Sequence, residues 1–122
     1  MKSVKIISAS NPTLEISAGL CETFQSRFLG FMFRKSPGQN YGLFFPGSSD
    51  SRINTAIHMF FVNFRLAVYW LDKNNVVVDK AMAERWRPLY MPCKPARHIL
   101  ELHENRIDAF AIGDRLNVTY VE

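Results

Sequence analysis

Long hydrophobic runs are missing from this chain of 122 residues. The longest, Met59–Val62 and Leu66–Leu71, are far shorter than the ~20 residues that a helix needs to cross a bilayer. The start, Met1–Lys5, leads into no apolar stretch of the kind found in a secretory signal peptide. We therefore expect a protein without a membrane segment, located in the cytoplasm.

Cysteine is scarce as well, and a strong catalytic motif is missing. Cys21 and Cys93 are the only cysteines, which is too few for a disulfide framework, so we expect two free thiols. Because no nucleophile, phosphate-binding or metal motif stands out, the sequence does not decide whether the protein is an enzyme.

The composition excludes disordered and fibrous proteins. Hydrophobic residues make up 48% of the chain and charged residues 21%, whereas disordered chains are poor in apolar residues and fibrous chains repeat. No internal repeat, linker or low-complexity tract divides the sequence. One globular domain that covers residues 1–122 is therefore expected.

Positive charge is concentrated in one segment. The chain has 15 Lys and Arg against 11 Asp and Glu, a net charge of +4. Residues 85–97, called the basic loop below, contain Arg85, Arg87, Lys94 and Arg97 but no acidic residue. This loop is either an anion-attracting patch or a solvated surface. Nucleic-acid binding is not expected, because no second basic segment of this kind is present.

Alternation of apolar and polar side chains predicts mostly strands. The expected strands cover residues 4–8, 41–45, 53–61, 66–71, 76–79, 97–103 and 116–121. Asn11–Pro12 predicts a turn after the first strand, and Asp72–Asn75 predicts a hairpin, because Asn and Asp tolerate positive φ. The expected fold class is mainly β, a compact single-domain barrel or sandwich with one or two short helices.

Two short helices complete this prediction. The first begins after Thr23, which is suited to be its N-cap. Its apolar face consists of Phe24, Phe28, Phe31 and Met32. The second begins at Asn105 and ends before Gly113, which can adopt a left-handed conformation. Its inward side chains are Ile107, Phe110 and Ala111.

Several blocks of sequence resemble one known family. These blocks are Phe28–Arg34, Tyr41–Phe45, Ile53–Phe61, Val68–Asp72, Pro95–Leu102 and Ile112–Leu116. In this order they resemble the prokaryotic family called domain of unknown function 192, over about residues 20–121. The resemblance implies a compact, mostly β single domain, and it implies no established activity, substrate or cofactor. This chain departs from the family by having Arg65 and Ala67 where the family usually has proline and aspartate.

The favoured function is a binding module for a small polar or anionic ligand, with carbohydrates among the candidates. Period two places Asn54 and His58 on one face of the strand at 53–61, where we expect them to border the main cavity. The basic loop would cover this cavity, with aromatic and basic side chains for stacking and anion binding. The candidate ligand-binding residues are therefore Asn54, His58, Trp86, Arg87, Lys94 and Arg97.

The alternative is a small hydrolase or lyase that uses His58 as acid or base, together with Glu101 or Asp114. Glu101 lies within an apolar run, where a carboxylate needs a partner, so an ion pair with an arginine is expected. The arginines considered for this ion pair are Arg34, Arg97 and Arg115.

No metal and no cofactor are expected. Cys93, His98 and His103 are the right residue types for zinc, but alternation places His98 and His103 on opposite faces of one strand. The oligomeric state is left open by the sequence.

Overall fold

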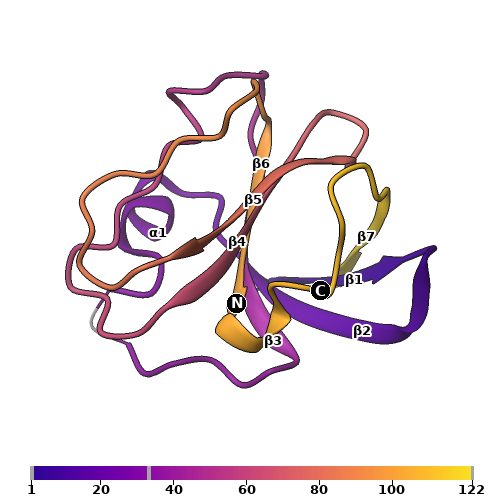
Figure 1. The fold of residues 1–122 in the computed structure, drawn as a ribbon, viewed down its shortest axis with the longest axis horizontal. Helices are drawn as coiled ribbons and strands as arrows, with labels where there is room; N and C mark the ends of the chain where they lie inside the picture. The colour runs from indigo at the N-terminus through magenta and orange to yellow at the C-terminus, as the bar shows by residue number, and fades with distance from the viewer. Residues whose placement is uncertain (1, 33, 122) are drawn as a thin grey trace.

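Seven strands pair into one strongly bent sheet in the computed structural model, which describes residues 2–32 and 34–121 (Figure 1). The elements are β1 (Ser3–Ser8), β2 (Asn11–Leu20), α1 (Phe24–Leu29), β3 (Tyr41–Phe45), β4 (Leu66–Leu71), β5 (Val77–Ala83), β6 (His98–His103), a 3-10 turn (Glu104–Arg106) and β7 (Leu116–Val121). The predicted class, mainly β with short helices, is confirmed. No helix among these residues is long and apolar enough to cross a membrane.

The strand order is β5-β4-β6-β3-β2-β1-β7. All neighbours are antiparallel except β2 and β3, which are parallel. The two edge strands do not pair along their length, so the sheet is not a closed barrel. The two edges meet at an isolated bridge, Val76 to Arg115, next to which the Val77 N–H donates to the carbonyl of Asp114 at 2.9 Å.

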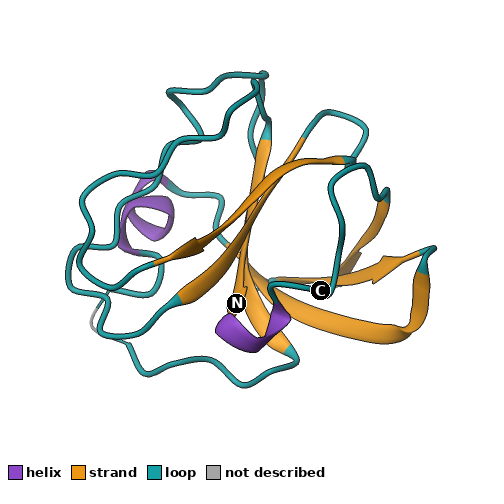
Figure 2. Ribbon diagram, viewed as in Figure 1, coloured by secondary structure: helices purple, strands orange, loops and turns teal. Residues whose placement is uncertain are grey.

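Apolar side chains form two clusters on opposite faces of this sheet. The inner core draws residues from all seven strands, with Tyr69, Leu100 and Phe110 among its largest members. The outer core lies under α1 and the long loops that cover β3, β4 and β6 on the other side (Figure 2). Strand alternation decides which face a residue joins, and Trp70 and Val68 belong to the outer core. Both side chains are almost completely buried there.

The predicted hairpin at residues 72–75 is confirmed, and its tip is held by Asp72. One carboxylate oxygen of Asp72 accepts hydrogen bonds from the backbone N–H groups of Asn74 at 2.8 Å and Val76 at 3.1 Å. Asn75 has a φ of 61°, which an Asn side chain tolerates better than most. This turn sets the register of β4 against β5.

The first predicted helix exists but is shorter than its apolar pattern indicates. Thr23 and Ser26 form a capping box, which confirms the predicted N-cap. The helix ends at Leu29 because Gly30 follows with a φ of 46°, a value that favours glycine. Phe31 and Met32 therefore lie after the helix rather than on it. The side chains of Phe24 and Phe28, which complete the predicted face, lie outside the described part of the structure.

Three predictions about secondary structure are wrong. Residues 11–20 form the ten-residue strand β2, which was not predicted; the turn lies just before it at residues 9 and 10. Residues 53–61 form no strand but two turns, at residues 54–55 and 60–61, with an isolated bridge from Ile57 to Tyr90 between them, and Ile53 is 78% exposed. The predicted helix after Asn105 is replaced by the 3-10 turn at Glu104–Arg106, which His103 caps by accepting a hydrogen bond from the backbone of Asn105.

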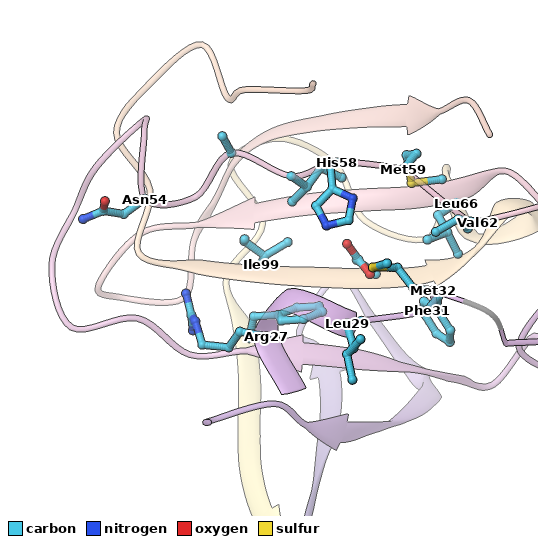
Figure 3. A pocket seen from close by; sticks show the side chains of 15 residues that line it. Arg27, Leu29, Phe31, Met32, Asn54, His58, Met59, Val62, Leu66 and Ile99 are labelled. Atoms are coloured by element: carbon cyan, nitrogen blue, oxygen red, sulfur yellow. The ribbon is translucent and has the colours of Figure 1, made fainter. Parts of the chain in front are cut away.

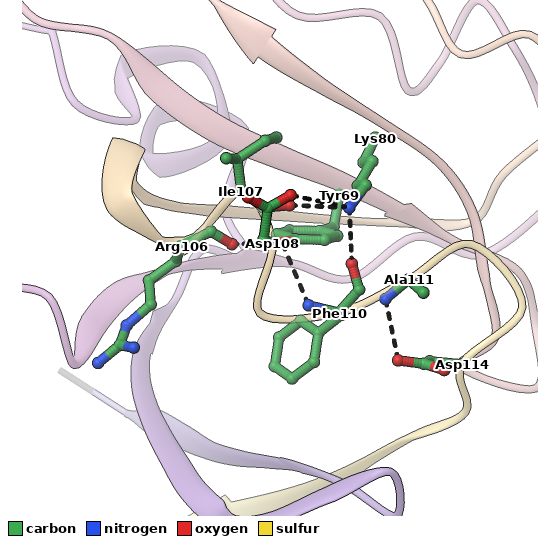
Figure 4. A network of polar contacts seen from close by, with 8 residues as sticks. All are labelled: Tyr69, Lys80, Arg106, Ile107, Asp108, Phe110, Ala111 and Asp114. Carbon is green, nitrogen blue, oxygen red and sulfur yellow. Dashed lines mark hydrogen bonds and ion pairs between the residues drawn. The ribbon is translucent and has the colours of Figure 1, made fainter.

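The segment after this turn is attached to the sheet by buried and partly buried polar contacts (Figure 4). The hydroxyl of Tyr69 donates to the carbonyl of Arg106 and accepts from the N–H of Phe110 at 3.4 Å. The ammonium of Lys80 donates to the carbonyls of Ile107 at 2.9 Å and Phe110 at 3.0 Å. These bonds satisfy backbone groups that have no strand partner, and they hold Phe110 in the inner core.

Candidate functional site

A cavity of about 310 Å³ lies between the outer face of β6 and the loops that cover it. Its walls come from α1 and the turn after it, from residues 54–62, and from strands β3, β4 and β6. Most lining side chains are apolar, namely Leu29, Phe31, Met32, Phe45, Ala56, Ile57, Met59, Val62, Leu66 and Ile99. The polar exceptions are Arg27, Asn54, His58 and Glu101. We call this space the apolar cavity.

Glu101 is the unusual member of the apolar cavity. Alternation along β6 puts its side chain on the same face as Ile99, and the residue is only 6% exposed. Burial disfavours the charged carboxylate and raises the pKa of Glu101 from 4.5 to about 8. Glu101 is therefore mostly a neutral carboxylic acid at pH 7, which can donate one hydrogen bond and accept others.

The ion pair predicted for Glu101 is not formed. Within residues 2–32 and 34–121, no ion pair involves this carboxyl, and Arg97 pairs instead with Asp50 at 3.1 Å. The reason is that β6 directs Glu101 under the covering loops, whereas Arg97 precedes the strand and lies near its edge. Gly30 packs closely here, since a Cβ built on it would lie 3.6 Å from Glu101 Oε1.

His58 also lines the apolar cavity, although it lies on a loop rather than on the predicted strand. Its Nδ1 accepts a hydrogen bond from the N–H of Phe60 at 3.2 Å, so the neutral ring carries its proton on Nε2. Figure 3 shows the ring directed into the cavity, between Ile99 and Met59. His58 and Glu101 thus share one small space.

Arg27 and Asn54 form the polar end of the apolar cavity. In Figure 3 they lie at one end, whereas Phe31, Val62 and Leu66 lie at the other. Beyond them is a second, open hollow of about 610 Å³, called the polar hollow below. It is lined by Glu22, Arg27, Pro46, Gly47, Ser48, Ser49, Asn54, Thr55 and Arg97. Arg27 and Asn54 belong to both spaces.

The basic loop does not cover the apolar cavity as predicted. Trp86, Arg87 and Lys94 line neither of the two spaces, and only Arg97 reaches the polar hollow. Trp86 instead packs edge-on against Phe61 with ring centroids 4.9 Å apart, and its indole N–H donates to Asn63 Oδ1 at 2.7 Å. The guanidinium of Arg87 lies over the Tyr90 ring at 4.9 Å. Local contacts therefore hold this loop beside the cavity.

The other candidates for chemistry lie apart from this site. Asp114 accepts hydrogen bonds from Ser10 at 3.0 Å and from the Ala111 N–H at 2.9 Å, and the second of these bonds is drawn in Figure 4. In the part of the chain that the structure describes, no three His, Cys, Asp or Glu side chains are grouped so as to hold a metal ion. Both cysteines are free; Cys21 is buried and Cys93 is exposed.

Sequence reasoning missed Arg27 and Gly30 as site residues. Arg27 is the basic residue in the last turn of α1, and Gly30 ends that helix. A signal was present, because a helix that ends on glycine and is followed by apolar residues places its last turn against the core. What the sequence does not indicate is that α1 covers β6 and thereby brings Arg27 to the cavity that contains Glu101.

These features define a small β protein with one bent sheet and a mainly apolar cavity under the loops on its outer face. The sequence matches the model of the family described as DUF192, Uncharacterized ACR, over residues 5–118, and the chain belongs to this family. The match begins earlier than the predicted resemblance at about residue 20, because it includes β1 and β2.

Relatives in sequence agree with this assignment. UPF0127 protein PF1050 of Pyrococcus furiosus is 36% identical over 105 residues, covering 84% of this chain and 87% of that protein. UPF0127 protein TK1120 of Thermococcus kodakarensis is 43% identical over 82 residues, covering 67% of this chain and 50% of that protein.

Two crystal structures share the fold at low sequence identity. A putative transcription regulator from Sinorhizobium meliloti 1021 matches with a TM-score of 0.84 at 19% identity, covering 96% of this chain and 92% of that one. A protein of unknown function from Novosphingobium aromaticivorans matches with a TM-score of 0.77 at 18% identity, covering 94% and 83%. At these identities the likeness concerns the fold alone.

Proposed function

We propose that the protein binds a small, mainly apolar molecule whose one hydrogen-bonding group is held by Glu101 in the apolar cavity. The observation that carries this proposal is a buried carboxyl in a cavity whose walls are otherwise mostly apolar. Burying a polar group costs free energy unless it is hydrogen-bonded. A ligand hydroxyl or amide would supply that bond and would place its apolar body against Phe31, Phe45 and Met59.

The size and charge of the site support a neutral anchoring group. A volume of about 310 Å³ is at the small end of ligand pockets, which span roughly 300–1,000 Å³. Because the pKa of Glu101 is raised to about 8, the carboxyl is mainly protonated at pH 7 and suits a neutral partner. The ligand proposed for the apolar cavity is therefore more apolar than the small polar or anionic ligand that the sequence predicts.

The cytoplasmic location stays a prediction.

The test uses 4-propylphenol, a neutral probe with one hydroxyl and an apolar body, in calorimetric titrations at pH 6.5. We expect wild type to bind it, Glu101→Gln to bind within about threefold, and Glu101→Leu to bind at least tenfold more weakly, because only leucine lacks hydrogen-bonding groups. Glu15→Gln is the matched control, since Glu15 forms an exposed ion pair with Lys5 at 3.6 Å and lies outside the cavity lining. Equal binding by wild type and Glu101→Leu would contradict the proposal.

Acid–base catalysis is a second candidate, and one observation favours it. His58 and Glu101 line the same cavity, and a carboxyl whose pKa is about 8 can donate a proton near neutral pH. A hydrolase or lyase of this kind would convert a panel of small aryl esters and hydroxy acids, as followed by mass spectrometry. Both His58→Gln and Glu101→Gln should then abolish turnover, whereas a binding protein returns every compound unchanged.

A further inference from the structure

We infer that the apolar cavity and the polar hollow form one site for an amphipathic carboxylate, with the apolar body in the cavity and the carboxylate between Arg27 and Arg97. This inference rests on the proposed function and adds the chemical class of the ligand. A ligand of this class has a hydrogen-bonding group at one end for Glu101 and a single negative charge at the other.

The first argument is that the two spaces adjoin. Arg27, from the last turn of α1, and Asn54, from the loop after β3, line both of them. Figure 3 shows these two side chains together at one end of the cavity, opposite the apolar end at Phe31 and Leu66. A molecule that fills the cavity and extends past Arg27 therefore enters the polar hollow.

The second argument is the donor chemistry of the polar hollow. The structure uses one terminal nitrogen of Arg27 to bind the carbonyl of Pro46, and it uses Nε of Arg97 to bind Asp50 at 3.1 Å. A guanidinium has five N–H donors in a planar fork, so each arginine keeps further donors suited to a carboxylate. Ser48 and Ser49 line the same hollow.

The third argument concerns how much negative charge the hollow accommodates. Arg27 and Arg97 bring two positive charges, but Glu22 lines the same hollow and Asp50 pairs with Arg97. These two carboxylates offset much of the attraction and would repel a dianion more strongly than a monoanion. The balance favours a singly charged carboxylate over a phosphate monoester.

The experiment compares two probes that share one body: 4-propylphenol and 3-(4-hydroxyphenyl)propionate, which ends in a carboxylate. For wild type at low salt we expect the carboxylate to bind about tenfold more tightly, because charge-assisted hydrogen bonds contribute more than neutral ones. Raising the salt concentration should reduce this preference, because screening weakens exposed charge interactions. The phenol alone should bind equally at both salt concentrations.

Two variants test the role of Arg97 with opposite expected signs. Asp50→Asn releases Arg97 from its ion pair and should strengthen binding of the carboxylate several-fold. Asp50→Asn with Arg97→Gln removes the pair as a unit, leaves no unpaired Asp50, and should remove most of the carboxylate preference. Neither change should alter the affinity of 4-propylphenol by more than about twofold. Arg87→Gln, in the basic loop away from both spaces, is the matched control and should change neither probe.

The outcomes separate this inference from the proposed function. If 4-propylphenol binds and depends on Glu101, but the carboxylate binds no more tightly or is indifferent to the Arg97 change, the inference is overturned and the proposed function stands. If neither probe binds to wild type, both are overturned. A carboxylate preference that Asp50→Asn increases and the double variant removes supports the inference.

Discussion

A single carboxyl makes the stability of this protein depend on pH. The pKa of Glu101 is raised by burial from 4.5 to about 8 in the folded chain, whereas the unfolded chain restores a value near 4.5. Between these values the folded state holds a proton that the unfolded state has lost. The free energy of unfolding contributed by Glu101 is therefore fully present below pH 4.5 and declines as the pH rises to about 8.

The corresponding prediction compares wild type with Glu101→Gln by urea unfolding from pH 5 to pH 9. The wild-type free energy of unfolding should fall relative to that of the variant, by at most about 1.4 kcal/mol per pH unit, and the difference should level off above pH 8. Glutamine does not titrate, so the variant lacks this contribution. Parallel curves for the two proteins would show that Glu101 is ionised in the folded state. Glu15→Gln, on the surface, should follow wild type.

The sequence predicts only part of the candidate site that contains Glu101. Glu101 interrupts an apolar run and His58 carries an imidazole, so both are predicted from the sequence as candidates for acid–base chemistry, and both line the apolar cavity. The arginine ion pair was a wrong prediction, because it depends on which segment covers β6. Trp86 and Arg87 are predicted from their chemical types, but they pack against Phe61 and Tyr90 outside both spaces, and Lys94 lines neither space.

At the scale of elements, hydrophobic alternation predicted the strands well where local hydrogen bonds did not compete. Residues 54–60 alternate in burial almost as predicted, yet they form turns at both ends and only the isolated bridge from Ile57 to Tyr90 between them. Ser51 explains part of this, because its hydroxyl accepts from the N–H of Asn54 at 3.0 Å and its carbonyl accepts from the hydroxyl of Thr55 at 2.6 Å. Such local bonds compete with strand pairing.

The missed strand β2 has a different cause. Its apolar residues Leu14, Ile16 and Ala18 do alternate with polar ones, so the signal was present. Half of its ten residues, Asn11, Pro12, Glu15, Ala18 and Gly19, are of types with weak β propensity. Pairing with β1 on one side and β3 on the other overrides that weak preference.

The segment at residues 104–114 allows a second prediction, made with Tyr69→Phe. This change removes the hydroxyl that bonds the backbone of Arg106 and Phe110 and should destabilise the fold by roughly 1–3 kcal/mol, because it leaves buried backbone groups unpaired. Urea unfolding measures the loss, and hydrogen exchange should show faster opening at residues 104–114 than elsewhere. Tyr120→Phe is the matched control, because Tyr120 is 59% exposed; equal effects of both changes would contradict the role of the network.

At the scale of the whole molecule, the inner core and the outer core are built on the same strands and do not form separate domains. Alternate residues of β4 enter opposite clusters, with Ala67, Tyr69 and Leu71 in the inner core and Leu66, Val68 and Trp70 in the outer one. Losing either cluster therefore removes support from one face of the same strand. The loops over the cavity are attached in the same way, since the indole of Trp70 donates to the carbonyl of Thr55 at 2.7 Å.

The last prediction is that both cores unfold in one cooperative step. The chain has 2 Trp, so in Trp86→Phe the fluorescence comes from Trp70 alone and reports on the outer core, while far-ultraviolet circular dichroism reports on the whole sheet. Because β4 is buried on both faces, we expect the two urea transitions to coincide in midpoint and slope. A fluorescence transition that precedes the loss of circular dichroism would mean that the covering loops and the outer core separate from the sheet first. The site of the proposed ligand would then be the least stable part of the molecule, and saturating 4-propylphenol should bring the two transitions together, since a ligand stabilises the state that binds it.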